Sequence, residues 1–353
     1  MQPGMHPSDR PAAVPVPAAV AELVRSAESI AVLTGAGMSR ESGIATFREA
    51  QVGLWEQYDP VEIASVDGWN RDNALVWGWY QWRAHVARQA DPNDGHIALA
   101  ELASHRTVSI VTQNVDDLHE RAGSRVISHL HGSLFSPRCE HCGTPYLGTD
   151  AFLPDDADVS PQLRATPPTC MHCLSLVRPG IVWFGEALPM DAWSRAEAAV
   201  VMADVVLVIG TSGIVYPAAR LPETALAAGI PVIEINPEAT QLSAAASYHW
   251  QGTAATTLPA LVAAINAACV GIGAAILGIP LVILPIMLLG RRVRDLSRHA
   301  SHRAGRRGDD DGVSRGQLAD LVQSVERGQS GHAEGAEPGR RARDRRVDDA
   351  DAG

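Results

Sequence analysis

The chain contains no lysine, so all 29 of its basic residues are arginines. A protein without lysine offers no side chain of its own for regulation by lysine acylation. The net charge is −11, and the excess of acidic residues lies in residues 1–266, which argues against nucleic acid as the principal ligand. Residues 1–17 lack an apolar run of the length that export requires. We therefore expect a disordered lead and a cytoplasmic catalytic domain.

The sequence also lacks a serine or cysteine nucleophile in a recognisable elbow. One cysteine, Cys269, lies alone in a long apolar stretch near the C-terminus. Covalent catalysis by this protein is therefore not expected.

The other four cysteines form two Cys-x-x-Cys pairs, Cys139 with Cys142 and Cys170 with Cys173. This arrangement is typical of a closed tetrahedral zinc site, in which thiolates fill all four positions and leave none for water. Such a site is structural, so the chemistry must lie elsewhere. Two disulfides are the alternative, which an intracellular chain disfavours. His172, in the second spacer, is a competing ligand.

Short apolar runs alternate with helical patterns along residues 18–266. The apolar runs are 30–34, 108–112, 205–209 and 231–235. The helical stretches are 18–29, 96–104, 193–202 and 218–228. This alternation predicts an α/β fold, a Rossmann-like doubly wound parallel sheet with helices on both faces. Two insertions interrupt it, a tryptophan-rich helical insertion at 49–96 and a small zinc lobe at 136–179.

Glycine and polar residues follow the predicted strands, where ligands bind in sheets of this kind. Segment 35–39 allows backbone amides to approach a pyrophosphate, although a plain turn has the same pattern. Segment 113–116 offers amide and carboxylate groups to a ribose or a nicotinamide, and a polar helix cap is its alternative. A dehydrogenase would carry an acidic residue roughly 20 positions after the glycines, at the end of a strand. Glu56 has that spacing without that setting, which weakens the dehydrogenase interpretation.

Three further side chains are candidates for chemistry. His131 is a candidate general base near neutral pH, with a structural histidine as the alternative. Tyr80 and Arg83 lie one turn apart on one face of a predicted helix, where a hydroxyl and a guanidinium suit a carboxylate. An aromatic stripe with a solvated arginine is the alternative for that pair.

Taken together and in this order, the segments resemble the sirtuins, the NAD-dependent protein-lysine deacylases. The matching segments are GAGMSRESGIATFR (35–48), TQNVDDLHERAG (112–123), HLHGS (129–133), the two cysteine pairs, RPGIVWFGE (178–186), GTSGIVYPAA (210–219) and INPE (235–238). They span nearly all of residues 20–266.

The resemblance implies a defined reaction. The acyl-lysine oxygen attacks the ribose of NAD and expels nicotinamide, and the histidine that matches His131 then deprotonates a ribose hydroxyl that takes up the acyl group. The products are free lysine, nicotinamide and O-acyl-ADP-ribose. By the same match the catalytic residues are His131, Asn114 and Asp116, and the cysteines hold one structural Zn²⁺.

The resemblance also assigns the residues that surround NAD and the substrate. Those near the pyrophosphate and the reacting ribose are Gly35, Ala36, Gly37, Ser39, Phe47 and Arg48. Those near the ribose and nicotinamide are Gln113, Asn114, Val115 and Asp116. Those on the adenosine side are Gly210, Thr211, Ser212, Asn236, Pro237, Glu238 and Ala254. Val182, Trp183, Phe184 and Gly185 match the strand that pairs with the substrate peptide through its backbone, which implies low sequence selectivity.

Tyr80 and Arg83 match a pair that is typical of class III sirtuins, which accept negatively charged acyl groups. The resemblance therefore predicts a bacterial-type enzyme that removes succinyl and malonyl groups from lysine, and acetyl groups as well.

The resemblance stops near residue 264. Residues 267–290 carry no charge and are long enough to cross a bilayer, and the arginine-rich residues 291–353 are predicted to be disordered. The positive-inside rule keeps the arginines cytoplasmic, and a single span would then place the catalytic domain outside, away from NAD. Three interpretations stay open: a hairpin or interfacial anchor bent at Pro280 and Pro285, a span with the tail outside, or a fused or frame-shifted extension.

The expected partners are acylated-lysine proteins, not nucleic acid, with membrane contact through 267–290 and a monomeric catalytic domain. Two other functions use the same pocket. One is an NAD-dependent ADP-ribosyltransferase. The other is a non-catalytic module that binds acyl-lysine, against which the presence of His131, Asn114 and Asp116 argues.

Overall fold

The computed structural model describes residues 15–45, 57–155 and 159–277. The chain divides into two compact units between residues 279 and 280, and every described residue lies in the first. Most of the predicted lead, the start of the helical insertion and the predicted tail at 291–353 therefore lie outside the described residues.

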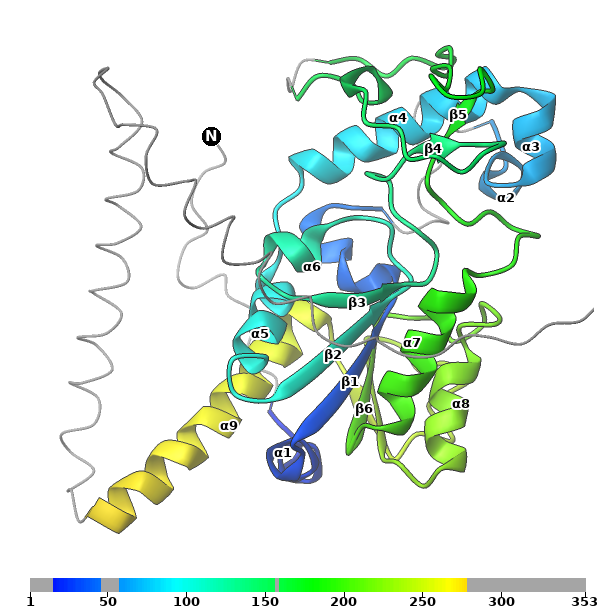
Figure 1. The fold of residues 1–353 in the computed structure, drawn as a ribbon. Helices are drawn as coiled ribbons and strands as arrows, with labels where there is room; N and C mark the ends of the chain where they lie inside the picture. The colour runs from blue at the N-terminus through cyan, green and yellow to red at the C-terminus, as the bar shows by residue number, and fades with distance from the viewer. Residues whose placement is uncertain (1–14, 46–56, 156–158, 278–353) are drawn as a thin grey trace, which may run out of the picture. The chain divides into compact units, whose positions relative to one another are not determined.

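A six-stranded parallel sheet forms the centre of the described structure (Figure 1). Its strands are β1 (Ser29–Thr34), β2 (Thr107–Thr112), β3 (Val126–His129), β6 (Val205–Ile209), β7 (Val232–Asn236) and β8 (Tyr248–Gln251). They lie in the order β3-β2-β1-β6-β7-β8, so the order reverses beside β1. The Rossmann-like parallel sheet predicted from the sequence is confirmed, and ligands bind at such a reversal point.

The predicted strands are the four in the middle of the sheet. The two edge strands, β3 and β8, were not predicted. Each has only four residues, VISH in β3 and YHWQ in β8, and these include histidine and other polar residues. Neither sequence therefore forms the continuous apolar run that marks a buried strand.

Helices cover both faces of the sheet because side chains alternate along each strand. On one face, Ile30 and Val32 pack with α1 (Ala18–Ser26), α5 (Asp94–Leu102) and α9 (Ala254–Leu277). On the other face, Ala31 and Leu33 pack with α7 (Met190–Val201) and α8 (Arg220–Ala227). The doubly wound arrangement follows directly from this alternation.

The helix α9 continues past residue 266, where the sequence analysis ended the domain. Leu258, Leu261 and Ile265 of α9 are buried in the core of the sheet. Among the residues that the structure describes, no helix has both the length and the apolarity of a membrane span. The predicted segment 267–290 thus begins as the end of α9, and its part beyond residue 277 lies outside the described residues.

The two predicted insertions share one hydrophobic core of their own, and we call them together the lobe (Figure 1). The first contributes α2 (Pro60–Ile63), α3 (Val66–Arg71) and α4 (Asn73–Gln89), and the second contributes the antiparallel strands β4 (Arg138–Cys139) and β5 (Val177–Arg178). Trp69 and Trp77 pack in this core with Cys139, Cys170 and Val177. The first insertion was predicted to extend to residue 96. Its last helix ends at Gln89, and the next helix, α5, packs against the sheet.

Candidate active site

The loops that follow β1 and β6 touch each other through their backbones. The Gly37 amide donates to the Gly210 carbonyl oxygen at 2.8 Å, and the Gly35 amide donates to Ile209 at 3.0 Å. A Cβ atom on Gly37 would lie 2.7 Å from the Gly210 Cα atom, and Gly210 itself has a φ of 61°. Only glycine fits both positions, so these glycines serve a close approach of two loops as well as a turn.

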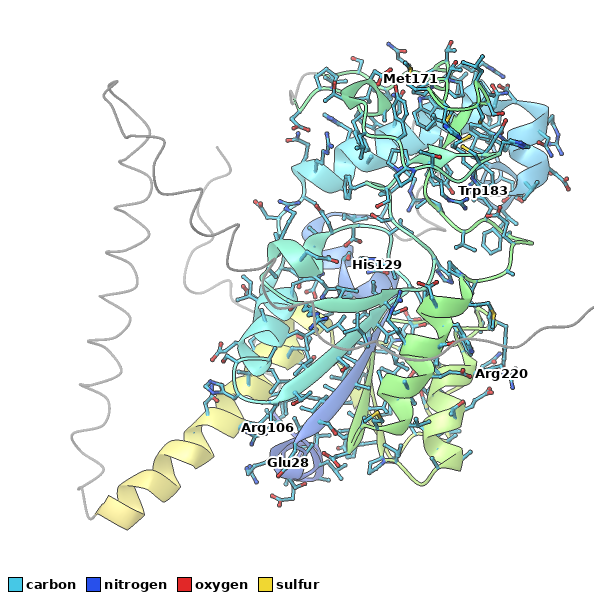
Figure 2. The ribbon with its side chains drawn as sticks, in the orientation of Figure 1. Glu28, Arg106, His129, Met171, Trp183 and Arg220 are labelled. Carbon is cyan, nitrogen blue, oxygen red and sulfur yellow. The ribbon has the colours of Figure 1, made fainter. Side chains whose placement is uncertain are left out.

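The loops after β2 and β7 join the same edge through Thr211. The Gln113 Nε2 atom donates to the Thr211 hydroxyl at 3.3 Å, and the Asn236 Nδ2 atom donates to its carbonyl oxygen at 2.9 Å. In Figure 2, His129 at the end of β3 lies at the edge of the sheet nearest the lobe and the labelled Trp183, whereas Glu28 and Arg106, which precede β1 and β2, lie at the opposite edge. The structure thus brings together the strand-end segments that the sequence predicted.

Ser39, Asn114 and Asp116 form a buried chain of hydrogen bonds. The Asn114 Nδ2 atom donates to the Ser39 hydroxyl at 3.0 Å, and that hydroxyl donates to the Asp116 carboxylate at 2.9 Å. Burial raises the pKa of Asp116, although the bonds from the Leu118 amide and from Ser39 act in the opposite direction. The three side chains are therefore held in fixed orientations and form a polar wall beneath the strand ends.

His131 lies two residues after β3 and contacts Gln113, the residue before Asn114. Its Nδ1 atom is 3.1 Å from the Gln113 carbonyl oxygen. A carbonyl oxygen only accepts, so we assign the proton to Nδ1, and Nε2 then keeps its lone pair. Burial lowers the pKa of His131, and the bond to Gln113 offsets part of that shift. The imidazole is therefore neutral near pH 7 and can accept a proton at Nε2.

Tyr80 and Arg83 lie on α4. Burial raises the pKa of Tyr80 to about 12, opposed by the positive charge of Arg83. Burial also lowers the pKa of Arg83, while Tyr80 and Asp116 raise it. The Arg83 Cζ atom lies 4.8 Å from the centre of a Trp79 ring. The Arg83 side chain is therefore packed against Trp79, not fully solvated, and its guanidinium interacts electrostatically with Asp116.

The segment 182–185 connects the lobe to the sheet. The Val182 amide donates to the His131 carbonyl oxygen at 2.9 Å, and the Phe184 amide donates to Ala64 at 2.9 Å. The Trp183 amide donates to the Glu186 carboxylate at 2.8 Å. Three backbone amides of the segment that was predicted to pair with a peptide are therefore hydrogen-bonded within the chain. Gly185, the last residue of the segment, has a φ of 87°.

The four cysteines of the lobe are free thiols whose sulfur atoms all lie within 4.8 Å of one another. The Cys139–Cys173 and Cys142–Cys170 sulfur distances are 3.3 and 3.8 Å, far longer than a disulfide bond. Zn–S bonds of about 2.3 Å in a tetrahedron place the sulfurs about 3.8 Å apart. The donor set therefore fits one Zn²⁺.

Backbone amides support the same interpretation of the cysteine cluster. The amides of His141 and Cys142 donate to the Cys139 sulfur, and the His172 amide donates to the Cys170 sulfur, each at 3.4 Å. Such N–H···S bonds favour thiolates. Among the described residues, the group of side chains that could hold a metal ion consists of the four cysteines. His172, the competing ligand considered above, is not part of it.

The remaining predicted residues lie in the loops that follow the strands or at the start of α9. The Val115 carbonyl oxygen accepts from the Leu134 amide, the Pro237 carbonyl oxygen accepts from the Gln251 side chain, and the buried Ala254 begins α9. Ala36, Ser212 and Glu238 lie in the loops after β1, β6 and β7. Phe47 and Arg48 lie outside the described residues.

A buried hydrogen-bonded relay lies behind the polar wall and was not predicted from the sequence. The Thr34 hydroxyl donates to Thr112, Thr112 accepts from the Asn114 amide, and the His119 Nε2 atom lies 3.1 Å from the Thr34 hydroxyl. Burial lowers the pKa of His119 to about 3, so it stays neutral. His119 was within a quoted segment, but only the packing of α6 (Leu118–Arg121) brings it to Thr34.

Comparison with known proteins gives one family. Residues 35–217 match the Sir2 family. An NAD-dependent protein deacylase of Corynebacterium glutamicum is 48% identical over 249 residues, which are 70% of this chain and 95% of that protein. The structure is similar to that of a Sir2 homologue in complex with NAD, with a TM-score of 0.64 and 43% identity over 71% of this chain and 94% of that one. It is also similar to a Sir2 homologue mutant in complex with 2′-O-acetyl ADP-ribose, with a TM-score of 0.64 and 41% identity over 72% of this chain and 98% of that one.

The fold and the strand-edge site define a Rossmann-like enzyme with a cysteine-rich lobe. The chain belongs to the Sir2 family. The predicted bacterial-type sirtuin and the enzyme class, an NAD-dependent protein deacylase, are confirmed, and NAD and a structural zinc are confirmed at the level of the family.

Proposed function

We propose that this protein removes succinyl, malonyl and acetyl groups from lysine side chains of other proteins in an NAD-dependent reaction. The observation that carries the proposal is the position of His131, whose Nδ1 atom is fixed by Gln113 beside the buried chain of Ser39, Asn114 and Asp116. A neutral base thus stands beside polar groups that suit a ribose.

The strand-end loops fit a dinucleotide. The loops after β1 and β6 approach each other through glycines, at the strand edge where a pyrophosphate would bind. The Gly35 and Gly37 amides are bonded to Ile209 and Gly210, so a pyrophosphate would contact other groups of these loops. Asn236, bonded to Thr211, and the neighbouring Glu238 lie where an adenosine would follow along the sheet edge. When bound, NAD supplies the ribose carbon from which nicotinamide leaves and the hydroxyl that takes up the acyl group.

His131 acts as the general base in this proposal. With its proton on Nδ1, the imidazole accepts a proton at Nε2 from a ribose hydroxyl. Asn114 and Asp116 orient the ribose, since both side chains are fixed by Ser39. The relay of His119, Thr34 and Thr112 in turn holds the backbone of Asn114.

Tyr80 and Arg83 recognise the charged end of the acyl group. A succinyl or malonyl group ends in a carboxylate, and the guanidinium of the half-buried Arg83 together with the Tyr80 hydroxyl offers it charge-assisted hydrogen bonds. Asp116 raises the pKa of Arg83, and this electrostatic interaction with a residue of the polar wall supports the assignment of the pair to the site. An acetyl group lacks the carboxylate and gains nothing from the pair.

The segment 182–185, which has only an isolated bridge from Phe184 to Ser65, is the part proposed to form a strand with the peptide, and we call it the peptide-binding strand. Its amides at Val182, Trp183 and Phe184 are bonded within the chain, so a peptide would pair with its other backbone groups. Backbone pairing makes the enzyme tolerant of peptide sequence. A monomeric state, a cytoplasmic location and membrane contact through 267–290 stay predictions.

The test uses the full chain, because a cut at residue 266 would divide α9. Matched succinyl-, malonyl- and acetyl-lysine peptides are incubated with NAD, and nicotinamide release and lysine exposure are followed by mass. We expect turnover of all three, faster for the charged groups. His131→Ala should lower the rate by about 10²–10⁴-fold, the usual contribution of a general base.

Each other outcome selects a different function. Transfer of ADP-ribose to protein without loss of the acyl group would indicate an ADP-ribosyltransferase. Peptide binding without turnover would indicate a binding module. Turnover of the acetyl peptide alone would keep the deacylase and remove the role of Tyr80 and Arg83.

A further inference from the structure

A largely buried ion pair closes the segment 178–186 into a loop. The Nη1 and Nη2 atoms of Arg178, the last residue of β5, lie 2.6 and 2.9 Å from the two carboxylate oxygens of Glu186. Only 7% of Arg178 is exposed. Two parallel N–H···O bonds between a guanidinium and a carboxylate fix both distance and orientation. The proposed peptide-binding strand lies between the two partners of this pair.

Both partners also hold that strand directly. The Nη2 atom of Arg178 donates to the Ile181 carbonyl oxygen at 3.0 Å, and the Glu186 carboxylate accepts from the Trp183 amide at 2.8 Å. The Arg178 Cζ atom lies 3.5 Å from the centre of a Trp183 ring. The pair therefore fixes the backbone at residues 181 and 183 and the side chain of Trp183.

The strand held in this way touches both halves of the proposed site. On the sheet side, the Val182 amide donates to the His131 carbonyl oxygen, and the Ser133 amide donates to Gly180 at 3.1 Å. On the lobe side, the rings of Trp183 and Trp69 have centroids 5.5 Å apart in the core that also holds Tyr80, and the Phe184 amide donates to Ala64. A displacement of this strand would therefore move the peptide relative to both His131 and the acyl pocket.

Stability alone gives a weak reason for such a pair. The desolvation free energy of a buried guanidinium and carboxylate offsets most of their Coulomb attraction. Proteins in which apolar residues replace such a pair are often equally stable. The stereochemical constraint is what an apolar pair of the same size would not supply.

We propose that Arg178 and Glu186 are positioning residues that hold residues 181–184 in the conformation to which the acyl-lysine peptide binds. The inference rests on the proposed function, since the peptide is part of it. Neither side chain touches the reacting atoms, so both act through the strand.

The test compares Glu186→Ala with Glu186→Gln in the full chain. The alanine variant loses every acceptor of the pair, and we expect its KM for a succinyl-lysine peptide to rise about tenfold or more, with the KM for NAD and kcat little changed. Glutamine keeps one oxygen for the Trp183 amide and should restore part of the affinity. Arg178→Lys, which keeps the charge and loses the planar fork, should resemble Glu186→Ala.

A surface ion pair serves as the matched control. Asp191 and Arg195 lie 3.0 Å apart on α7 with both side chains exposed. Asp191→Asn should leave all kinetic constants unchanged, because exposed pairs contribute little. Zinc content and Tm are measured for every variant.

Two results would overturn the inference: a peptide KM within twofold of the wild type, or a parallel rise of both KM values with a fall in Tm and zinc content. The failure of the proposed function is distinguishable, because the wild type would then release no nicotinamide with any peptide. Fluorescence anisotropy of a labelled succinyl-lysine peptide still measures the role of the pair in that case. A wild type that binds no peptide would overturn both proposals.

Discussion

The sheet and the lobe achieve their folds in different ways. The sheet buries continuous apolar strands under helices on both faces, and every residue of β6 is buried. The lobe has two strands of two residues each and packs its tryptophans around a cluster of cysteines. A core of buried strands holds itself together, whereas a core built around four thiols that face one another needs a cation to stabilise it.

The proposed site divides along the same line. The sheet supplies the residues toward NAD, and it places them through backbone contacts between loops. The lobe and the segment 182–186 that follows it supply the residues toward the acyl group and the peptide, and side-chain contacts such as those of Arg83 and Glu186 place them. Perturbing the lobe should therefore change how acyl-lysine is used, and perturbing the sheet edge should change how NAD is used.

Removing the metal from the lobe should have the largest effect. Cys142→Ser deletes one of the four ligands, and we expect loss of bound zinc, loss of the near-ultraviolet circular dichroism of the buried tryptophans, and loss of activity toward all acyl groups. The far-ultraviolet signal of the sheet and its helices should persist. Metal analysis and circular dichroism make the comparison.

Cys269→Ser is the matched control, because this cysteine belongs to neither pair. It should keep zinc and activity. Full activity in a zinc-free Cys142→Ser protein would contradict the dependence of the lobe on the cluster.

The pH dependence of turnover tests the sheet side. Since burial lowers the pKa of His131, the base is neutral above that lowered value and becomes protonated below it. The acid limb of kcat/KM should therefore lie below the ordinary histidine pKa of about 6.5, and the rate should fall about tenfold for each pH unit beyond it. A limb at or above pH 7 would show that another group, or an unburied histidine, controls the rate.

Arg83→Met tests the lobe side. Charge-assisted hydrogen bonds contribute about 1.5–3 kcal/mol, so we expect desuccinylation to fall about 10–100-fold while deacetylation changes little. The ratio of kcat/KM for the two peptides measures this difference. Arg71→Met, at an exposed arginine on α3 of the same lobe, should leave the ratio unchanged. Equal losses with both peptides would remove the specificity assigned to Arg83.

The sequence predicted the sheet side of the site better than the lobe side, for a physical reason. Parallel strands end at one edge, so Gly37, Asn114 and Gly210 must meet once the alternation of strands and helices is recognised. Helical spacing likewise places Tyr80 and Arg83 on one face of α4. That this face reaches Asp116 depends on how the lobe packs, which no local pattern contains.

The supporting contacts show the same limit. Arg178 and Glu186 lie eight residues apart in a segment with almost no regular structure, so no periodicity predicts their bond. The edge strands β3 and β8 were missed because four partly polar residues resemble a loop. The positions of residues at the ends of parallel strands can thus be predicted from the sequence. The positions of residues that depend on tertiary side-chain contacts cannot.

The smallest predicted effect comes from Gly37→Ala. Its Cβ atom would lie 2.7 Å from the Gly210 Cα atom, which is too close for any real contact with backbone, so the loops after β1 and β6 must move apart. We expect the KM for NAD to rise about threefold to tenfold, with turnover at saturating NAD and the KM for the peptide unchanged. Gly229→Ala is the control: its φ of 74° makes alanine strained, but nothing lies near its Cβ position, so it should lower Tm without changing either KM. A rise in the peptide KM with Gly37→Ala would mean that the two sides of the site are not separable in the way that the sheet and the lobe suggest.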